Sequence, residues 1–282
     1  MSNPIVAIVA QGAMGAGISG RLVENGLTVL TSLAGRSASS HQRASAAGMK
    51  AASDLECAQA DFFLSICPPS DALALAEKMA AIIANNSTKP VYVDCNAVSP
   101  QTKRVIGDTL INAGASFIDV GIIGLPPNGN NDPMLHASGP DASRFEIFRS
   151  FGIKLSLIDG PIGAASALKM SYAGITKGMI ALGSMMLLAA TRAGVADELR
   201  AELERTQASV LQVFARGVPG MFDKAYRFVG EMGEIAEFAG DDKSAAHMYR
   251  AIGEFYARIA LDHSGPHTET DALAGFLRIG RA

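Results

Sequence analysis

The segment IVAIVAQGAMGAG, residues 5–17, decides the fold of this chain. The apolar run at residues 5–10 predicts a buried strand, and three glycines follow it within seven residues. Residues 16–24 then have the pattern of a helix, and the apolar run at residues 28–33 predicts a second strand. A strand, a tight glycine turn, a helix and a further strand form a βαβ unit, which implies a parallel sheet.

The same alternation continues through the first half of the chain. Helices are expected over residues 72–84 and 100–113, and they separate short apolar runs that are typical of buried strands. The expected fold class is therefore an α/β Rossmann domain with a doubly wound parallel sheet. Its further strands are predicted at residues 62–67, 91–96, 116–121 and 134–139.

After Gly160 the strand pattern stops and only helical patterns remain. We expect a Rossmann domain over residues 1–160 and an all-α domain over residues 161–282. The last short helix should begin at Thr268, because Thr268-Glu-Thr-Asp271 resembles a capping box. The longer helices of this domain are predicted at residues 164–194, 196–216, 224–238 and 242–262.

Composition excludes several classes of function. Hydrophobic residues make up 49% of the 282, charged residues 18%, and the net charge is −3 with no basic run, which argues against nucleic acid as a partner. The three cysteines form no CxxC pair, and no Cys/His spacing predicts a metal site. The chain starts without a basic segment before an apolar one, so no signal peptide is expected and the interpretation is a cytoplasmic protein.

One apolar stretch could be mistaken for a membrane span. Residues 175–190 are almost all apolar, but Lys177 interrupts them and only 14 uncharged residues separate it from Arg192. This run is short for a bilayer, so we expect no membrane partner. A helix buried in a core or in a subunit interface is the better interpretation.

The glycine turn predicts a dinucleotide site. The sequence Ala10-Gln-Gly12-Ala13-Met14-Gly15 is close to the fingerprint GxGxxG, with alanine in place of the first glycine. Gly12 would let the backbone approach a pyrophosphate, and Gly15 would let the helix pack on the strand. The alternative is a tight βα turn that binds no ligand.

The end of the second strand favours NADP over NAD. NAD-binding domains place an acidic residue there for the ribose hydroxyls, but residues 31–43 (TSLAGRSASSHQR) contain none. Arg36 and Ser37 are suited instead to a 2′-phosphate, with Arg43 as a possible helper. The alternative for Arg36 is an arginine in a solvated loop.

With these motifs the chain resembles the β-hydroxyacid dehydrogenase superfamily, which includes 6-phosphogluconate and 3-hydroxyisobutyrate dehydrogenases, and within it the subgroup with a divergent C-terminal domain. Four elements carry the resemblance in order along the chain. They are the turn AQGAMG, the segment Gly35-Arg36-Ser37, the stretch Asp94-Cys-Asn96-Ala-Val-Ser99-Pro100, similar to the family's D-x-S-T-x-S-P loop, and Gly163 to Lys169 followed by Met-Ser-Tyr172.

The resemblance implies an NADP-dependent oxidoreductase that acts on a small β-hydroxy acid or a related hydroxyl compound. It implies that Lys169 is the acid/base residue and that Cys67 and Pro68 line the cofactor site. Asn96 follows the end of a predicted strand, where α/β sheets place ligands, so we expect its amide to contact the nicotinamide ribose or the substrate; the alternative is a role in the turn alone. Members of the family usually form dimers through the helical domain, so a homodimer is expected here.

The chain departs from the family pattern on the substrate side. Ile123, followed by Gly124, stands where the family often has a carboxylate-binding serine, and Tyr172 stands where it has an asparagine. Asn96 occupies the first serine position of the D-x-S-T element. The candidate substrate residues are therefore Ile123, Gly124, Lys169 and Tyr172, and the identity of the substrate stays open.

Two lysines in the most apolar helical region need an explanation. Desolvation would lower the pKa of Lys169 toward neutrality, where its amine can take up the proton of a hydroxyl group, although a buried ion pair is the alternative. Tyr172 lies one turn further on and could donate to the same oxygen, or simply pack. Lys177 is expected to reach the surface or to pair with a carboxylate, and Arg227 and Glu231 suit a salt-bridged helix face but could reach the cleft.

Two other functions remain open from the sequence. Imine reductases share the architecture but lack the lysine, so Lys169 argues against imine reduction without excluding it. The second alternative is an NADPH-binding regulatory protein that has lost catalysis, because the serine and asparagine of the family are replaced.

Overall fold

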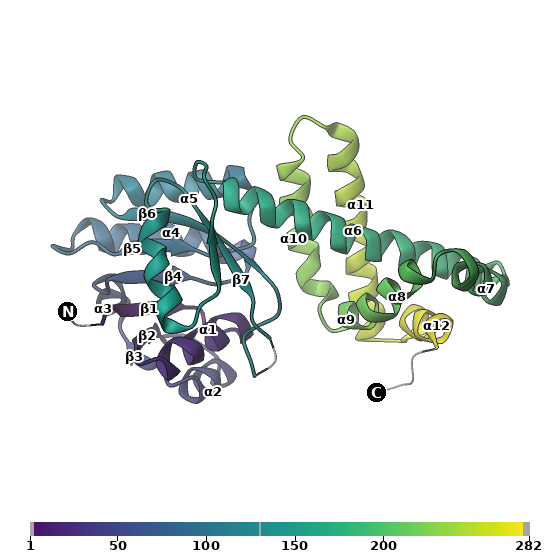
Figure 1. Cartoon of the computed structure of the whole chain (residues 1–282), viewed down its shortest axis with the longest axis horizontal. Coiled ribbons are helices and arrows are strands. Elements are labelled where there is room, and N and C mark those ends of the chain that lie inside the picture. The colour runs from purple at the N-terminus through teal and green to yellow at the C-terminus, as the bar shows by residue number, and fades with distance from the viewer. Residues whose placement is uncertain (1–2, 130, 279–282) are drawn as a thin grey trace. The chain divides into compact units, whose positions relative to one another are not determined.

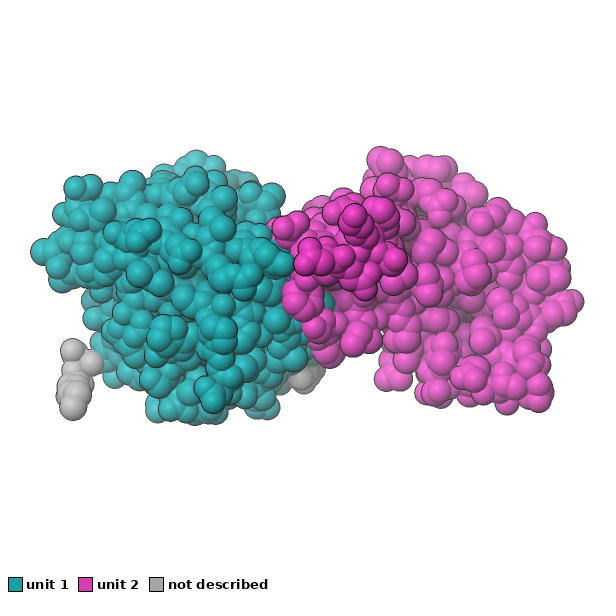
Figure 2. Space-filling view, turned by 90° about the horizontal axis from the view of Figure 1, so that it is seen from above, with its two compact units in different colours: residues 1–170 teal, residues 171–282 magenta. Residues whose placement is uncertain are grey.

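The chain was analysed as a computed structural model that describes residues 3–129 and 131–278. It divides into two compact units, residues 1–170 and 171–282, which are coloured separately in Figure 2. The first unit contains the sheet and the second contains only helices among its described residues.

The first unit is built on one eight-stranded sheet with the order β3-β2-β1-β4-β5-β6-β7-β8. The strands from β3 to β6 are parallel, and β7 runs antiparallel to β6 and parallel to β8. This confirms the Rossmann fold with its doubly wound sheet. The strands are β1 (Ile5–Val9), β2 (Thr28–Ser32), β3 (Lys50–Ala52), β4 (Phe62–Ser65), β5 (Val91–Asp94), β6 (Ser116–Ile123), β7 (Met134–Ser138) and β8 (Leu155–Leu157).

Helices cover both faces of this sheet because alternate strand residues point to opposite sides. Helices α1 (Ala13–Glu24) and α2 (Ala38–Ala46), with the 3₁₀ helix η1 (Ala142–Phe151), pack on the face that carries Ile8, Leu64 and Val93. Helices α4 (Pro69–Ala84) and α5 (Pro100–Asn112) lie side by side on the other face, where Phe63, Tyr92 and Phe117 form a stacked row (Figure 1).

The six strands predicted from the sequence are all present, but several short elements were not predicted. These are β3, β8, α2 and the five-residue helix α3 (Asp54–Ala58). The two strands have three residues each and lie at opposite edges of the sheet, so neither has the continuous apolar run of a central strand. Helix α3 depends on a capping box between Ser53 and Glu56 rather than on an apolar stripe.

The described residues of the second unit form the greater part of α6 (Ala164–Arg192) and six further helices. Helices α10 and α11 pack against each other along their lengths (Figure 1). The helix predicted over residues 196–216 is divided at Gln207 into two. The six helices are α7 (Ala196–Thr206), α8 (Ala208–Gly217), α9 (Pro219–Phe222), α10 (Ala225–Phe238), α11 (Lys243–His263) and α12 (Thr268–Leu277).

The capping box expected at Thr268 is wrong, although the helix does begin there. Thr268 is the first helical residue of α12 rather than its cap. The carboxylate of Asp262, at the end of α11, accepts hydrogen bonds from the backbone N–H groups of Glu269 and Thr270 and from the Thr270 hydroxyl. These bonds outweigh burial and hold the pKa of Asp262 below its usual value. Asp262, a residue of the preceding helix, thus caps the N-terminus of α12 in place of a side chain from its own first turn.

The boundary between the compact units falls within α6, at residues 170 and 171 rather than at 160 and 161. The first turns of α6 are hydrogen-bonded to side chains on β6 and β7, as described below, so they belong to the first unit. The rest of α6 packs with the helices of the second unit, where Tyr256 on α11 donates a hydrogen bond to the backbone of Lys177.

Two glycines on α1 give a matched test of the turn. A Cβ atom on Gly15 would lie 2.1 Å from the Ala10 carbonyl oxygen, whereas one on Gly20 would meet nothing within 4 Å. We expect Gly15→Ala to lower the free energy of unfolding by about 1–3 kcal/mol, because backbone must move to admit the methyl group. Gly20→Ala should raise it by up to about 1 kcal/mol, because alanine favours the helix. Urea unfolding of both variants measures the difference, and equal effects would contradict this account of the turn.

Candidate functional site

The end of β1 and the start of α1 form an open, uncapped turn. Gly12 precedes the helix with an extended backbone, and in the described part of the chain no side chain caps this end. A Cβ atom on Gly12 would meet nothing within 4 Å, so the space beside the backbone is open. The N–H groups of Ala13, Met14 and Gly15 lie in this first turn, where a helix has donors without partners of its own. This arrangement suits the phosphate groups of a dinucleotide.

Gln11 supports this turn from inside the protein. Its side chain is buried, and its amide nitrogen donates to the Ser32 carbonyl oxygen (2.9 Å) and to the Thr31 hydroxyl. The Arg43 Nε in turn donates to the Gln11 carbonyl oxygen at 2.7 Å. Arg43 was expected to help bind a 2′-phosphate. In the structure its Nε is occupied by the hydrogen bond to the Gln11 carbonyl oxygen. The turn is therefore tied to both β2 and α2.

Arg36 and Ser37 lie beyond β2, at the start of α2. The Arg36 side chain is exposed, and the Ser37 hydroxyl accepts a hydrogen bond from the Ser40 N–H as the N-cap of α2. In the folded chain one acidic residue, Asp54 at the start of α3, lies near Ser32 and Arg36. Asp54 forms an ion pair with Lys78 at 2.6 Å. Burial tends to raise the pKa of Asp54, but hydrogen bonds from Lys78 and Ser32 and the charges of Lys78 and Arg36 outweigh it and lower the pKa.

Asn96 joins the loops that follow β4 and β5. Its side-chain oxygen accepts the Cys67 N–H at 2.7 Å, and its amide nitrogen donates to the Ser65 hydroxyl and to Asp94, both at 2.8 Å. Asn96 is only 2% exposed, and both of its amide protons are used within the protein. Contact with a ligand stays a prediction, and it would have to use the remaining lone pair of Oδ1.

Cys67 and Pro68 occupy the loop that Asn96 holds. Pro68 immediately precedes α4, and the Cys67 side chain is half-buried. Burial, with a smaller contribution from the charge of Asp94, raises the pKa of the Cys67 thiol to about 12. The thiol is therefore protonated at neutral pH and is not a nucleophile. Its expected place beside a cofactor stays a prediction.

A buried ion network lies next to these loops. The side chains of Asp94, Lys103 and Asp119 are all fully buried. The Lys103 amine donates to the Asp94 carboxylate and to its carbonyl oxygen (2.9 Å), and it lies 3.5 Å from the Asp119 carboxylate. Burial alone would lower the pKa of Lys103, but the two carboxylates outweigh it and raise the pKa, so the amine is charged.

The sequence analysis did not single out Lys103, although a signal was present. Lys103, Ile106 and Leu110 recur at helical spacing on α5, and all three are buried. A lysine on the apolar stripe of a helix implies a buried charge with a partner. The partner in this case is Asp94, which belongs to the D-x-S-T-like motif of the sequence.

Asp119 also holds the start of α6. One carboxylate oxygen accepts the backbone N–H groups of Gly163 (2.9 Å) and Ser166 (3.1 Å), and the other accepts the Ser166 hydroxyl at 2.7 Å. Ser138 on β7 donates to Asp119 and accepts the Ala165 N–H. A carboxylate at this end of the helix is favoured because it faces the positive end of the helix dipole.

Lys169 lies in the second turn of α6, directly over β6. A Cβ atom on Gly121 would lie 2.7 Å from the Ala165 carbonyl oxygen and 3.1 Å from the Cβ of Lys169. Only glycine at this position lets the helix approach so closely. Ile123 is two residues further along β6 on the same face, at the strand's end. Gly124 then follows with a φ of +132° and packs against Pro133.

His136 is a neighbour of this group that the sequence analysis missed. It is directly opposite Gly121 in the antiparallel β6–β7 pair, so its side chain is on the face that α6 covers. Burial lowers the pKa of His136, so the imidazole is neutral at neutral pH.

Tyr172 and Lys177 belong to the second unit. Tyr172 is 50% exposed. Lys177 forms an ion pair with Glu231 on α10 and lies 4.3 Å from the centre of the Phe228 ring. The prediction that Lys177 pairs with a carboxylate is therefore confirmed.

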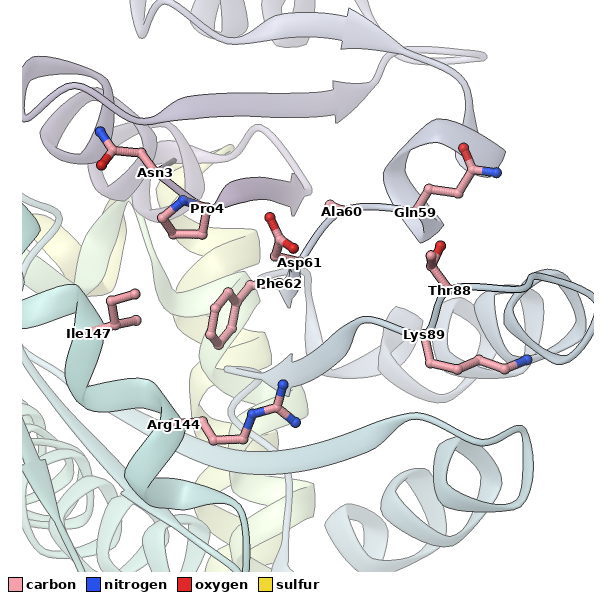
Figure 3. A pocket seen from close by; sticks show the side chains of 10 residues that line it. All are labelled: Asn3, Pro4, Gln59, Ala60, Asp61, Phe62, Thr88, Lys89, Arg144 and Ile147. Carbon is pink, nitrogen blue, oxygen red and sulfur yellow. The ribbon is translucent and has the colours of Figure 1, made fainter. Parts of the chain in front are cut away.

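A separate pocket opens at the amino-terminal edge of the sheet (Figure 3). Its three charged side chains already have partners: Asp61 accepts the Ile5 N–H, Arg144 donates to Ser116, and Lys89 donates to the Ala84 carbonyl oxygen. Ligands of open α/β sheets bind at the opposite edge, beyond the carboxyl ends of the strands. We therefore assign the functional site to the carboxyl edge.

Comparison with known proteins agrees with this geometry. A family model described as the NAD binding domain of 6-phosphogluconate dehydrogenase matches residues 5–151, which is just over half of the chain. The chain belongs to the 6-phosphogluconate dehydrogenase-like family. A domain of unknown function, DUF1932, matches residues 190–259, within the helical unit. This confirms the resemblance, including the divergent C-terminal domain.

Proteins that are similar to this chain in sequence or in fold come from several organisms. An uncharacterised 28.5 kDa protein of Methanothermus fervidus is 30% identical over 213 residues, which cover 74% of this chain and 81% of the relative. The 3-hydroxyisobutyrate dehydrogenase of Mycobacterium tuberculosis is 16% identical with a TM-score of 0.72, and each chain is covered completely. An imine reductase of Myxococcus stipitatus, solved with NADP⁺, is 17% identical with a TM-score of 0.61 over 97% of this chain and all of that one.

Proposed function

We propose that this protein is an NADP-dependent oxidoreductase that transfers hydride between a small β-hydroxy acid, or a related hydroxyl compound, and the nicotinamide, with Lys169 as acid and base. The family has an NAD(P)-binding domain and a hydroxyacid dehydrogenase-like fold. The observation that carries the proposal is the anchored α6, which holds Lys169 over the carboxyl-terminal half of β6. Reacting groups in open α/β sheets lie at this edge.

The proposed proton transfer follows from the chemistry of a primary amine. Oxidation of a hydroxyl group releases a hydride and a proton, and the bound cofactor supplies the hydride acceptor. The neutral amine of Lys169 takes the hydroxyl proton, and in the reverse direction its ammonium form returns that proton to the carbonyl oxygen. Tyr172, one turn further on α6, is proposed to donate to the same oxygen, and Ile123 and Gly124 to line the substrate.

The preference for NADP is proposed from charge. No acid in residues 31–43 competes with a 2′-phosphate, and Arg36 is exposed at the start of α2 with Ser37 beside it. A guanidinium forms two parallel hydrogen bonds to a phosphate, which gives both affinity and specificity. Reduced cysteines, two of them buried, fit the proposed cytoplasmic location.

Arg36→Ala and Arg43→Ala separate cofactor preference from support of the turn. Loss of Arg36 should weaken NADPH binding about 10- to 100-fold and leave NADH binding unchanged, because only NADPH carries the 2′-phosphate. Loss of Arg43 should weaken both nucleotides alike, since its Nε holds the Gln11 carbonyl. Fluorescence titration measures both constants. An unchanged NADPH-to-NADH ratio in Arg36→Ala would exclude Arg36 as the specificity residue.

Lys169→Met tests the acid/base assignment. Turnover of the hydroxy acid found by a substrate screen with NADP⁺ should fall about 10²- to 10⁴-fold, while NADPH binding stays unchanged. Lys154→Met is the control, because Lys154 is exposed and pairs with Asp132. Full activity of Lys169→Met on cyclic imines would indicate an imine reductase. Tight NADPH binding without turnover of either class would indicate a protein that has lost catalysis.

The remaining face of α6 supports the proposal of a homodimer. Only 33% of its most apolar 18-residue window is buried, although by length and composition this helix could cross a membrane. Four exposed apolar side chains follow one another at spacings of four, three and four residues, the spacing of paired helices. Residues 178–191 contain no charge that would repel a second copy. The stripe consists of Ile175, Met179, Leu182 and Met186.

A charge in this stripe should separate the copies. We expect Ile175→Glu combined with Leu182→Glu to give a monomer, because both side chains are more than half exposed in the single chain and would be buried in the dimer. Leu261→Glu, at a position that is 73% exposed but outside the stripe, is the control and should not change the mass. Light scattering after size exclusion measures the mass. A monomeric unmodified protein would refute the proposal.

A further inference from the structure

We infer that Lys103 is a positioning residue, whose buried amine joins the loop at the cofactor side of the site to the helix that carries Lys169. The inference rests on the proposed function of Lys169. Lys103 lies on α5 and is fully buried, so it acts through other residues rather than on a ligand.

The charges show why Lys103 cannot be a simple ion-pair partner. One ammonium lies between two fully buried carboxylates, which leaves an excess negative charge in the core. Such a charge is very costly unless hydrogen bonds compensate for it. The compensation comes from two different places, since Asp94 binds the loop after β5 and Asp119 binds the N-terminus of α6. Each carboxylate is thus held by Lys103 on one side and holds a site element on the other.

Asp94 is the link to the cofactor side. It accepts the backbone N–H and the side-chain amide of Asn96, and the Asn96 oxygen in turn accepts the Cys67 N–H. The Lys103 amine also donates to the Asn96 carbonyl oxygen at 3.3 Å. Lys103 therefore fixes both the side chain and the backbone of the residue that holds the β4–α4 loop.

Asp119 is the link to the acid/base side. Ser166 meets Asp119 through both its N–H and its hydroxyl, and Lys169 lies three residues further, almost one helical turn. At Lys169 the helix α6 packs directly against β6. A Cβ atom on Gly121 would lie only 3.1 Å from the Cβ of Lys169, so the two backbones are in close contact. A helix that rests so closely on a strand can still tilt or slide, and the bonds to Asp119 and Ser138 resist this motion.

The consequence concerns the distance between the two reacting groups. Hydride and proton transfer require the nicotinamide, the substrate and the lysine amine in one geometry, and a misplacement of about 1 Å can cost about 10²-fold in rate. Lys103 contacts Asp94, which holds the loop on the cofactor side, and Asp119, which holds the start of α6. Removing one of these contacts should therefore lower the rate of turnover much more than the affinity for the nucleotide.

Two serines on α6 provide a matched experiment. Ser166 donates to Asp119, whereas the Ser184 hydroxyl is equally buried and has no hydrogen-bond partner among the described residues. Ser166→Ala should lower kcat about tenfold and leave the Kd for NADPH unchanged, because it removes one bond that orients the helix. Ser184→Ala should change neither. Equal kcat values for the two variants would overturn the inference.

Lys103 itself is tested in a variant that removes one charge of each sign. Lys103→Met alone would leave two uncompensated carboxylates in the core, so it is combined with Asp119→Asn. The double variant keeps the volume of both side chains, and circular dichroism checks its fold. We expect kcat to fall about 10²-fold or more and NADPH still to bind within a few-fold of the unmodified protein. An unchanged kcat in a folded double variant would refute the role of Lys103.

A measurement without substrate separates this inference from the proposed reaction. The amine of Lys169 is labelled with acetic anhydride as a function of pH and analysed by mass spectrometry, with Lys154 as the internal reference. Ser166→Ala replaces a neutral side chain and keeps the titratable groups of the neighbouring elements, among them Asp119 on β6, His136 on β7 and Lys103 on α5. A changed titration midpoint for Lys169 in this variant, with Lys154 unchanged, therefore reports a displaced amine.

The outcomes are distinguishable. A displaced Lys169 midpoint in a protein that turns over no hydroxy acid would support the positioning role and refute the proposed reaction. Turnover that depends on Lys169 but shows the same kcat and the same midpoint in Ser166→Ala would support the reaction and refute the positioning role.

Discussion

The buried amine of Lys103 is the interaction on which both sides of the site depend. It forms ion pairs with the carboxylates of Asp94 and Asp119, both fully buried in the core between sheet and helices. Each carboxylate then uses its remaining oxygen lone pairs to hold backbone N–H groups of a neighbouring loop or helix. Polar groups in this core thus serve to place the reactive edge, while the apolar clusters on the two faces of the sheet supply the stability.

The dinucleotide turn uses a different constraint, which is the close approach of backbone to backbone. Gly15 lets α1 descend onto the Ala10 carbonyl, and Gly121 lets α6 descend onto β6. Both glycines lie where a helix meets a strand beside the site, and in both places a methyl group would displace the helix. Buried amide side chains tie down two loops of the site: Gln11 supports the turn before α1, and Asn96 holds the loop after β4.

Helix α6 combines two tasks that make opposite demands on its sequence. Its first turns carry polar contacts to Asp119 and Ser138 and present Lys169 to the sheet. Its later turns carry exposed apolar side chains at the spacing of paired helices. The same helix would therefore connect the chemistry of the first unit with the proposed contact between copies. The two lysines of this apolar segment then have different roles: Lys169 is proposed to serve the site, and Lys177 is paired with Glu231.

The sequence by itself determined the Rossmann fold, the positions of six strands and the glycine turn between β1 and α1, because these features depend on local spacing of apolar residues and glycines. It did not determine the edge strands β3 and β8, which have only three residues each. Only the tertiary structure decided that Asp262 caps α12, that Asn96 is occupied within the protein, and that His136 lies across from Gly121. It also decided that Lys103 joins Asp94 and Asp119, which are 25 residues apart in the chain. Such pairings depend on which strands become neighbours, and no local pattern records that choice.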